Sequence, residues 1–244
     1  MEAPQRLTAG QQTKGGDTLE PFFDSGGITI YHADCSDILP LVPTESVDLL
    51  LADPPYGMAY NPETSGRISA SLIESWQRYG GWAKDYAPIV GDDGPFDPAP
   101  LLAFGAVVLF GANYYADRLP PNGCWIVWDK KRGGTVTPGW NSSDAELAWT
   151  TFGGGVKVFQ HLWAGYKRDS ELGDHWHPTQ KPVALMKWII GRWTKPGDLV
   201  FDPYMGSGPI AQACHETGRR YIGVEIVEEY CETAVKRLAQ QVLF

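Results

Sequence analysis

Short runs of apolar residues recur along the chain, and several are apolar throughout instead of alternating with polar residues. The stretches LLLA (49–52) and LVF (199–201) are examples. Strands of this kind are typical of a parallel sheet whose two faces are both covered. We therefore expect strands at Ile28–His32, Val47–Ala52, Ala106–Gly111, Cys124–Trp128, Glu146–Thr150, Asp198–Phe201 and Tyr221–Glu225.

Helical spacing is clearest in the last third of the chain. One helix is predicted over Val183–Trp193, and a second begins at Pro209, because proline suits the first helical position. A third covers Val227–Val242, where apolar residues recur every three to four positions and form one face. The pattern predicts an α/β fold: a doubly wound, mostly parallel seven-stranded sheet with helices on both faces.

The length of 244 residues fits a single domain. Residues 1–26 are rich in Gly, Gln, Thr and Pro, so we expect a flexible arm followed by one domain over 27–244. Two long connections, 57–105 and 129–144, interrupt that domain. Connections longer than about 15 residues usually carry function or are mobile.

Charge and composition narrow the function. The net charge of −9 argues against indiscriminate binding of polyanions, although a local basic face can still recognise nucleic acid. The four cysteines are scattered without close pairs, so no metal site is expected. No apolar run reaches the roughly 18 residues of a membrane span, and no signal-peptide pattern is present, which predicts a cytoplasmic protein.

The stretch LVFDPYMGSGPIAQA (199–213) joins a buried strand, a terminal carboxylate, a glycine-bearing turn and a helix. Gly206 and Gly208 let the backbone approach a ligand at the carboxyl edge of the sheet. About twenty residues further on, a strand ends at Glu225, where an acid can accept hydrogen bonds from ribose hydroxyls. This layout favours a nucleoside site. A glycine at a tight corner is the alternative, and Pro209 argues against a phosphate-binding loop.

A second candidate is HPTQKPVALMKWII (177–190), in which Thr179 and Gln180 precede a helix. Lys181 adds a positive charge beside the free backbone N–H groups of the helix start, so a small carboxylate could bind there. A capped helix with a solvated lysine explains the same residues equally well.

A third candidate, DPPYG (53–57), ends a buried strand. The two prolines fix the backbone and donate no hydrogen bonds, so the carbonyl of Pro54 and the carboxylate of Asp53 are rigid acceptors. Two acceptors beside the flat ring of Tyr56 suit a planar amine such as the exocyclic amine of a nucleobase. An ordinary surface turn is the alternative, but its place at the end of a buried strand favours binding.

Together these stretches resemble motifs of the amino-methylating DNA methyltransferases that use S-adenosylmethionine. DPPYG resembles their catalytic motif, FDPYMGSG their cofactor loop, and HPTQKPV the motif that holds the methionine end of the cofactor. The catalytic motif comes first and the cofactor loop last, which is the circularly permuted order of the β class. The resemblance extends over most of residues 28–242.

The resemblance implies a methyltransferase-type Rossmann-like fold, S-adenosylmethionine as cofactor, and methyl transfer to a base flipped out of double-stranded DNA. Adenine N6 is the favoured target and cytosine N4 the second. An RNA base, a protein glutamine and a non-catalytic nucleic-acid-binding module are the alternatives. The base pocket would consist of Asp53, Pro54, Pro55 and Tyr56. The cofactor would contact Asp34, Cys35, Thr179, Gln180, Lys181, Asp202, Pro203, Tyr204, Gly206, Ser207, Gly208 and Glu225.

Two features depart from the family pattern. Pro209 replaces the threonine usual after GSG and removes a hydroxyl, and the region available for target recognition, 151–176, is short. Because the region is short, we expect a homodimer, which would double the basic surface and read a symmetric site. The residues expected to contact DNA are Lys130, Lys131, Arg132, Lys157, Lys167 and Arg168.

Overall fold

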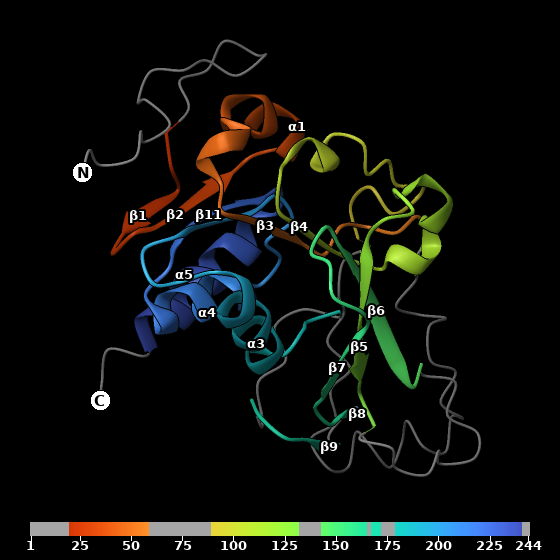
Figure 1. Ribbon diagram of the computed structural model, residues 1–244. Helices are drawn as coiled ribbons and strands as arrows, with labels where there is room; N and C mark the ends of the chain where they lie inside the picture. Colours follow the sequence, from red (N-terminus) through yellow and green to blue (C-terminus); the bar gives the residue numbers. More distant parts are fainter. Residues whose placement is uncertain (1–19, 59–88, 132–142, 165–166, 172–178, 241–244) are drawn as a thin grey trace.

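A twisted sheet forms the centre of the computed structural model, which describes residues 20–58, 89–131, 143–164, 167–171 and 179–240 (Figure 1). Within these residues the sheet has nine strands in the order β1-β2-β11-β10-β3-β4-β6-β5-β7. The strands are β1 (Phe23–Ser25), β2 (Ile28–His32), β3 (Leu49–Ala52), β4 (Val107–Phe110), β5 (Cys124–Asp129), β6 (Ala145–Thr150), β7 (Lys157–Gln160), β10 (Leu199–Asp202) and β11 (Arg220–Glu225). A separate ribbon pairs β8 (Trp163–Ala164) with β9 (Lys167–Arg168).

The middle of the sheet is parallel. Strands β2, β11, β10, β3 and β4 run in one direction, so their carboxyl ends meet at one edge. Strand β6 runs antiparallel to both of its neighbours, β4 and β5, and its first residues therefore reach that same edge. Acidic side chains from both kinds of strand can consequently meet there.

Helices cover the two faces unequally. The longer helices α3 (Val183–Trp193), α4 (Pro209–Thr217) and α5 (Glu228–Gln240) lie together on one face, and the short α1 (Cys35–Ile38) lies on the other (Figure 1). Short 3₁₀ turns complete the second face: η1 (Leu39–Leu41), η2 (Thr44–Ser46), η3 (Leu101–Ala103), η4 (Ala112–Tyr114) and η5 (Ala116–Arg118).

Strand β3 illustrates why its sequence is apolar throughout. Leu49 and Leu51 belong to the core beneath α3–α5, whereas Leu50 and Ala52 belong to the core beneath α1 and η3. All four residues are fully buried. Because successive side chains point to opposite faces, a strand buried on both sides needs an apolar residue at every position.

The predicted fold class is confirmed, with all seven expected strands and three expected helices present. The sheet is two strands wider than predicted, and it begins at Phe23 instead of near Ile28. Strand β1 has three residues and β7 alternates between half-buried and exposed positions, so neither carries the apolar run on which the prediction relied.

Much of the two long connections, 57–105 and 129–144, lies outside the described residues. The division of the chain into a flexible arm and one domain stays a prediction. The recognition region, 151–176, contains β7, β8 and β9 where it is described. None of the helices described is both long enough and apolar enough to span a membrane.

Candidate active site

Two of the predicted motifs lie side by side at the carboxyl edge of the sheet. Strand β3 leads into Asp53, and its neighbour β10 ends at Asp202. Strand β11, which ends at Glu225, lies on the other side of β10, and β2 follows it. The parallel register therefore brings the DPPY turn, the glycine turn and two further strand ends to one edge, the usual ligand position in such sheets.

The carboxylate of Asp53 is held by two donors. Its Oδ1 accepts a short hydrogen bond from the hydroxyl of Tyr56, and its Oδ2 lies 2.5 Å from Nζ of Lys181. Pro54 is buried, so the backbone beside Asp53 is fixed by packing as well as by the proline ring. Asp53 itself is 19% exposed, which leaves the carboxylate accessible at the surface of the site.

The ring of Tyr56 is positioned by its neighbours. It stacks on Tyr114, with ring centroids 5.4 Å apart and planes 13° from parallel, and Tyr114 is 53% exposed. Gly111, with a φ of +67°, lies so close that a β-carbon there would come within 1.9 Å of the Tyr56 ring. The sequence motif did not reveal these contacts, because both partners lie beyond β4.

The loop after DPPYG is anchored by Asp92, a residue that the sequence analysis missed. Its Oδ1 accepts hydrogen bonds from the backbone N–H groups of Gly57, at 2.8 Å, and Met58, at 3.1 Å. Asp92 is buried. It lies 35 residues from Gly57, within a long connection that carries no regular pattern, so local sequence could not have identified it.

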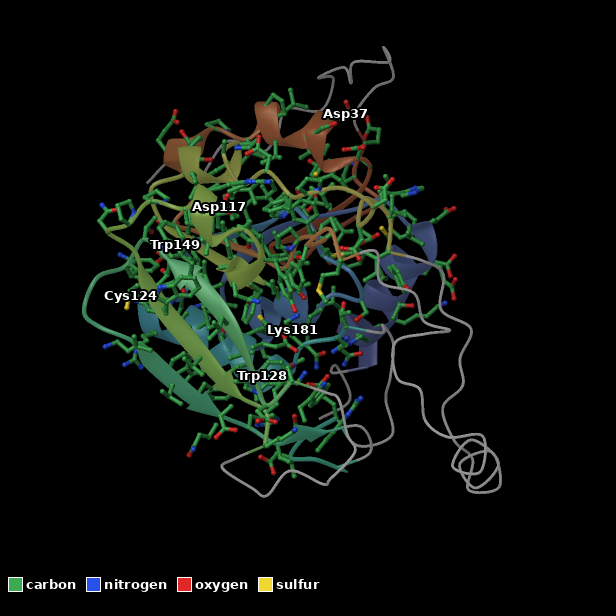
Figure 2. The ribbon with its side chains drawn as sticks, turned by 90° about the vertical axis from the view of Figure 1, so that its right-hand side faces the viewer. Asp37, Asp117, Cys124, Trp128, Trp149 and Lys181 are labelled. Atoms are coloured by element: carbon green, nitrogen blue, oxygen red, sulfur yellow. The ribbon has the colours of Figure 1, made fainter. Side chains whose placement is uncertain are left out.

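Lys181 lies beside the DPPY turn, and its expected contact with a cofactor carboxylate stays a prediction. It is buried, and its Nζ contacts both Asp53 Oδ2 and Glu146 Oε2, the latter at 3.1 Å. In Figure 2 Lys181 lies near the middle of the view, and its side chain is buried, whereas Asp37 lies at the outer rim. Glu146, at the start of β6, also pairs with Lys130 at 2.7 Å.

The charges of this cluster shift one another's pKa values. Burial raises the pKa of Asp53, and the positive charge of Lys181 partly offsets that increase. Burial lowers the pKa of Lys181, but its two carboxylate partners outweigh burial and raise the pKa above the ordinary value. Burial raises the pKa of Glu146, but Lys181 and Lys130 outweigh it and lower the pKa to about 2. Acidic and basic side chains therefore alternate along the cluster in the order Asp53, Lys181, Glu146, Lys130.

The glycine turn after β10 is shaped by Asp202 from inside. Asp202 is fully buried and accepts hydrogen bonds from the backbone N–H of Tyr204, at 3.1 Å, and the hydroxyl of Tyr221, at 2.9 Å. Burial raises the pKa of Asp202 to about 8. Gly208, with a φ of +78°, lies so close to α5 that a β-carbon would come within 2.7 Å of Ala234. Asp202 thus supports the turn.

Glu225 and Asp34 lie nearer the surface of the same edge. Glu225 is half-buried, and its two oxygens accept hydrogen bonds from the backbone N–H groups of Gly206 and Val227, each at 2.8 Å. Asp34 is exposed, and its Oδ1 caps α1 by accepting a hydrogen bond from Ser36 N at 2.8 Å.

Two further residues that we expected to contact the cofactor lie beside these acids. Burial raises the pKa of Cys35, which contacts the Tyr204 hydroxyl. Pro203 is buried beneath the turn.

A second buried network surrounds the helix start at which we expected a carboxylate. Glu171 occupies that position: its Oε1 accepts a hydrogen bond from Val183 N at 2.8 Å, and its Oε2 accepts one from Gln180 Nε2 at 2.7 Å. Arg237 of α5 pairs with Glu171 and also donates to the carbonyl and hydroxyl of Ser207. The network ties α3 to the glycine turn. Thr179 begins the adjoining turn.

The residues expected to contact DNA have partners within the chain. Lys131 pairs with Asp144, and Lys157 donates to the carbonyl of Gly154 at 2.6 Å. The Arg168 guanidinium lies 4.0 Å from the ring centroid of Trp163. Lys130 is part of the Glu146 cluster. The side chain of Lys167 and all of Arg132 lie outside the described residues, and the contact of this set with DNA stays a prediction.

The site therefore combines a strand-end carboxylate and a rigid carbonyl with a glycine turn and two strand-end acids, at the edge where sheets of this kind bind nucleotide-type ligands. Among the residues that the structure describes, no three His, Cys, Asp or Glu side chains lie close enough together to hold a metal ion.

The known proteins that this chain resembles are DNA methylases. A family model for DNA methylases of the N6/N4 type matches residues 125–236. The chain is 28% identical over 256 residues to the type II methyltransferase M.HinfI of Haemophilus influenzae, covering 87% of this chain and 68% of that one. It is 25% identical over 227 residues to YubD of Escherichia coli strain K12, named as a candidate methylase, with coverage of 85% and 88%.

Among solved structures, the cytosine-N4-specific PvuII DNA methyltransferase superposes with a TM-score of 0.57 at 17% identity, covering 93% of this chain and 91% of that one. This likeness concerns the fold alone. The family-model match and the curated relative M.HinfI confirm the predicted resemblance to the N6/N4 amino DNA methyltransferases.

Proposed function

We propose that this chain transfers a methyl group from S-adenosylmethionine to the exocyclic amine of a DNA base, with adenine N6 as the favoured target and cytosine N4 as the alternative. The observation that carries the proposal is the juxtaposition of two turns on neighbouring strands: residues 53–56 after β3, and residues 202–208 after β10. The resemblance to N6/N4 methylases supports the same reaction.

The residues at the edge fit the proposed cofactor. The Glu225 carboxylate is oriented by one backbone N–H group at each oxygen, and a carboxylate oxygen can accept a second hydrogen bond, here from a ribose hydroxyl. Gly206, with a φ of +55°, lets the backbone approach the ligand without a side chain between them. Asp34 would contact the adenine end. When bound, the cofactor supplies an electrophilic methyl group on a sulfonium.

Asp53 and Pro54 would act on the target base. The exocyclic nitrogen is a weak nucleophile because its lone pair is delocalised into the ring. The Asp53 carboxylate and the Pro54 carbonyl accept its two hydrogens, which favours a pyramidal nitrogen with its lone pair directed at the methyl carbon. Fixed acceptors also stabilise the positive charge that develops on the nitrogen. The nitrogen would then lose one of its protons to the Asp53 carboxylate, which is partly exposed and can pass it to water.

Tyr56 would hold the flipped base. Base–aromatic stacking contributes roughly 1 to 3 kcal/mol, which offsets part of the cost of unstacking. One face of the Tyr56 ring is stacked on Tyr114 in this structure. We infer that the base uses the other face or replaces the exposed Tyr114 ring.

Nucleoside analysis tests the proposal directly. The protein is incubated with mixed-sequence duplex DNA and methyl-labelled cofactor, and the DNA is digested to nucleosides. Label in N6-methyl-2′-deoxyadenosine is expected, label in N4-methyl-2′-deoxycytidine identifies the alternative, and absence of label from DNA overturns the proposal. Parallel reactions with RNA and with protein test the other acceptors.

Asp53→Asn separates chemistry from binding. Loss of a fixed charged acceptor should reduce methyl transfer by about 1000-fold, while calorimetry should find cofactor affinity unchanged. Asp117→Asn, an exposed aspartate on η5, is the matched control and should behave as wild type. Normal turnover by Asp53→Asn would remove Asp53 from the mechanism.

The DNA path and the dimer are further parts of the proposal. Lys157, Lys167 and Arg168 lie within the short recognition region, 151–176, and replacing all three by glutamine should reduce the slope of DNA affinity against salt concentration. An unchanged slope would place the DNA elsewhere. Sedimentation in the presence of DNA should show a homodimer, and a monomer at all concentrations would contradict that expectation.

A further inference from the structure

One buried ammonium group is shared by two carboxylates at the centre of the site. Nζ of Lys181 lies 2.5 Å from Asp53 Oδ2 and 3.1 Å from Glu146 Oε2. The Lys181 side chain is 3% exposed, whereas those of Asp53 and Glu146 are 19% and 27% exposed. The inference below rests on the proposed function, because it concerns the carboxylate assigned to the target amine.

The topology brings these residues together from three parts of the chain. Asp53 follows the parallel strand β3, and Lys181 precedes α3. Glu146 reaches the same edge because β6 is antiparallel to its neighbours β4 and β5. The ring centroids of Phe110 and Tyr56 lie 5.3 Å and 5.9 Å from the Lys181 ammonium, so aromatic rings flank the ion pair between Lys181 and Asp53.

The charges around Lys181 indicate whether it binds Asp53 or a carboxylate of the cofactor. Its ammonium already faces two carboxylates, so a third one, from a cofactor, would add excess negative charge to a buried site. The helix start beside it is bound by Glu171. The geometry therefore assigns Lys181 to Asp53 and not to the cofactor.

Glu146 is best understood as a fixed counter-charge. A proton relay from Asp53 through Lys181 to Glu146 would need Glu146 to accept a proton, but Lys181 and Lys130 lower the pKa of Glu146 to about 2. Glu146 therefore remains an anion and competes with Asp53 for the Lys181 ammonium.

We propose that Lys181 and Glu146 are positioning residues for Asp53. Lys181 stabilises the charged form of the half-buried Asp53 carboxylate and orients it, and Glu146 draws the ammonium partly away, so that Asp53 remains an effective acceptor for the amine. The groups that face Asp53 come from every element around it: Tyr56 in its own turn, Tyr115 beyond β4, Glu146 on β6, Lys181 before α3 and Asp202 at the end of β10.

Two substitutions test the proposal through opposite effects on the pKa of Asp53. Lys181→Met removes the cation, so the pKa of Asp53 rises and the acidic limb of the kcat profile moves to higher pH. At neutral pH its kcat should fall by about tenfold or more, and raising the pH should restore it. Glu146→Gln removes a neighbouring anion and leaves the ammonium to Asp53, so the acidic limb moves to lower pH while the plateau kcat decreases.

The same displacements can be measured without methyl transfer. Carboxyl carbons of aspartate, labelled with ¹³C, are followed by NMR during a pH titration, and the Asp53 signal is assigned by its loss in Asp53→Asn. The Asp53 midpoint should rise in Lys181→Met and fall in Glu146→Gln. Glu232→Gln, which breaks an exposed pair with Lys236 on α5, is the matched control and should leave the Asp53 midpoint unchanged.

The outcomes distinguish this inference from the proposed function. Midpoints that move in the same direction in both variants, or that do not move, overturn the positioning role. If the wild-type protein methylates no DNA, the proposed function fails, and the NMR titration alone decides the inference. If Lys181→Met does not fold, the displacement to lower pH in Glu146→Gln decides it.

Discussion

Gly111 offers a sharp test of how the site is built, because a single methyl group there should displace Tyr56. A β-carbon at Gly111 would lie 1.9 Å, 2.2 Å and 2.4 Å from three atoms of the Tyr56 ring. Carbon atoms pack at about 3.5 Å or more, so the ring must move by roughly 1.5 Å. Such a movement would break the hydrogen bond from Tyr56 to Asp53.

The expected magnitude has two parts. Gly111 has a φ of +67°, and a residue with a β-carbon loses about 1 to 2 kcal/mol in this conformation. Overpacking against the ring adds about 1 to 3 kcal/mol. Gly111→Ala should therefore lower the free energy of unfolding by about 2 to 5 kcal/mol, and a misplacement of this size should reduce kcat by about 100-fold.

Two control substitutions separate the backbone cost from the overpacking cost. Gly26 has a φ of +60°, and a β-carbon there has no neighbour within 4 Å, so Gly26→Ala should show the backbone cost alone with normal kcat. In a Tyr56→Ala background the ring is gone, and Gly111→Ala should cost less stability than it does beside the intact ring. Urea unfolding and single-turnover methyl transfer provide the measurements. If Gly111→Ala matches Gly26→Ala in both assays, the close packing of Tyr56 on Gly111 is refuted.

Three further results are expected. Asp202 has a folded pKa of about 8, above its unfolded value, so its protonated form stabilises the fold below the unfolded pKa, and this contribution is lost as pH rises through 8. Asp202→Asn should flatten the dependence of unfolding free energy on pH between about 4 and 8, and an unchanged pH dependence would argue against a protonated Asp202. Asp92→Ala removes the acceptor of two backbone N–H groups after DPPYG and should lower the unfolding free energy by about 1 to 3 kcal/mol, together with kcat; full activity would show that this loop is held by other contacts. Arg237→Met leaves the half-buried Glu171 without its cation and should lower the free energy of urea unfolding by about 1 to 3 kcal/mol, and adding Glu171→Gln to the same chain should partly restore it.

The sequence by itself determined the layers and the location of the site. Strands such as Leu49–Ala52 are apolar at every position because both of their faces are buried, and this pattern can be recognised locally. The DPPYG and glycine turns were equally recognisable, because proline and glycine restrict or free the backbone at a single position. Parallel strands then bring both turns to one edge.

The tertiary structure alone decided the partners within the site. Lys181 lies 128 residues from Asp53 in sequence, and Asp92 lies 35 residues from Gly57. Glu146 reaches the site only because β6 runs antiparallel beside β4, and that direction is set by pairing between distant segments. Charges and hydrogen bonds act through space over a few ångströms, so a local pattern can identify the groups but not which group faces which.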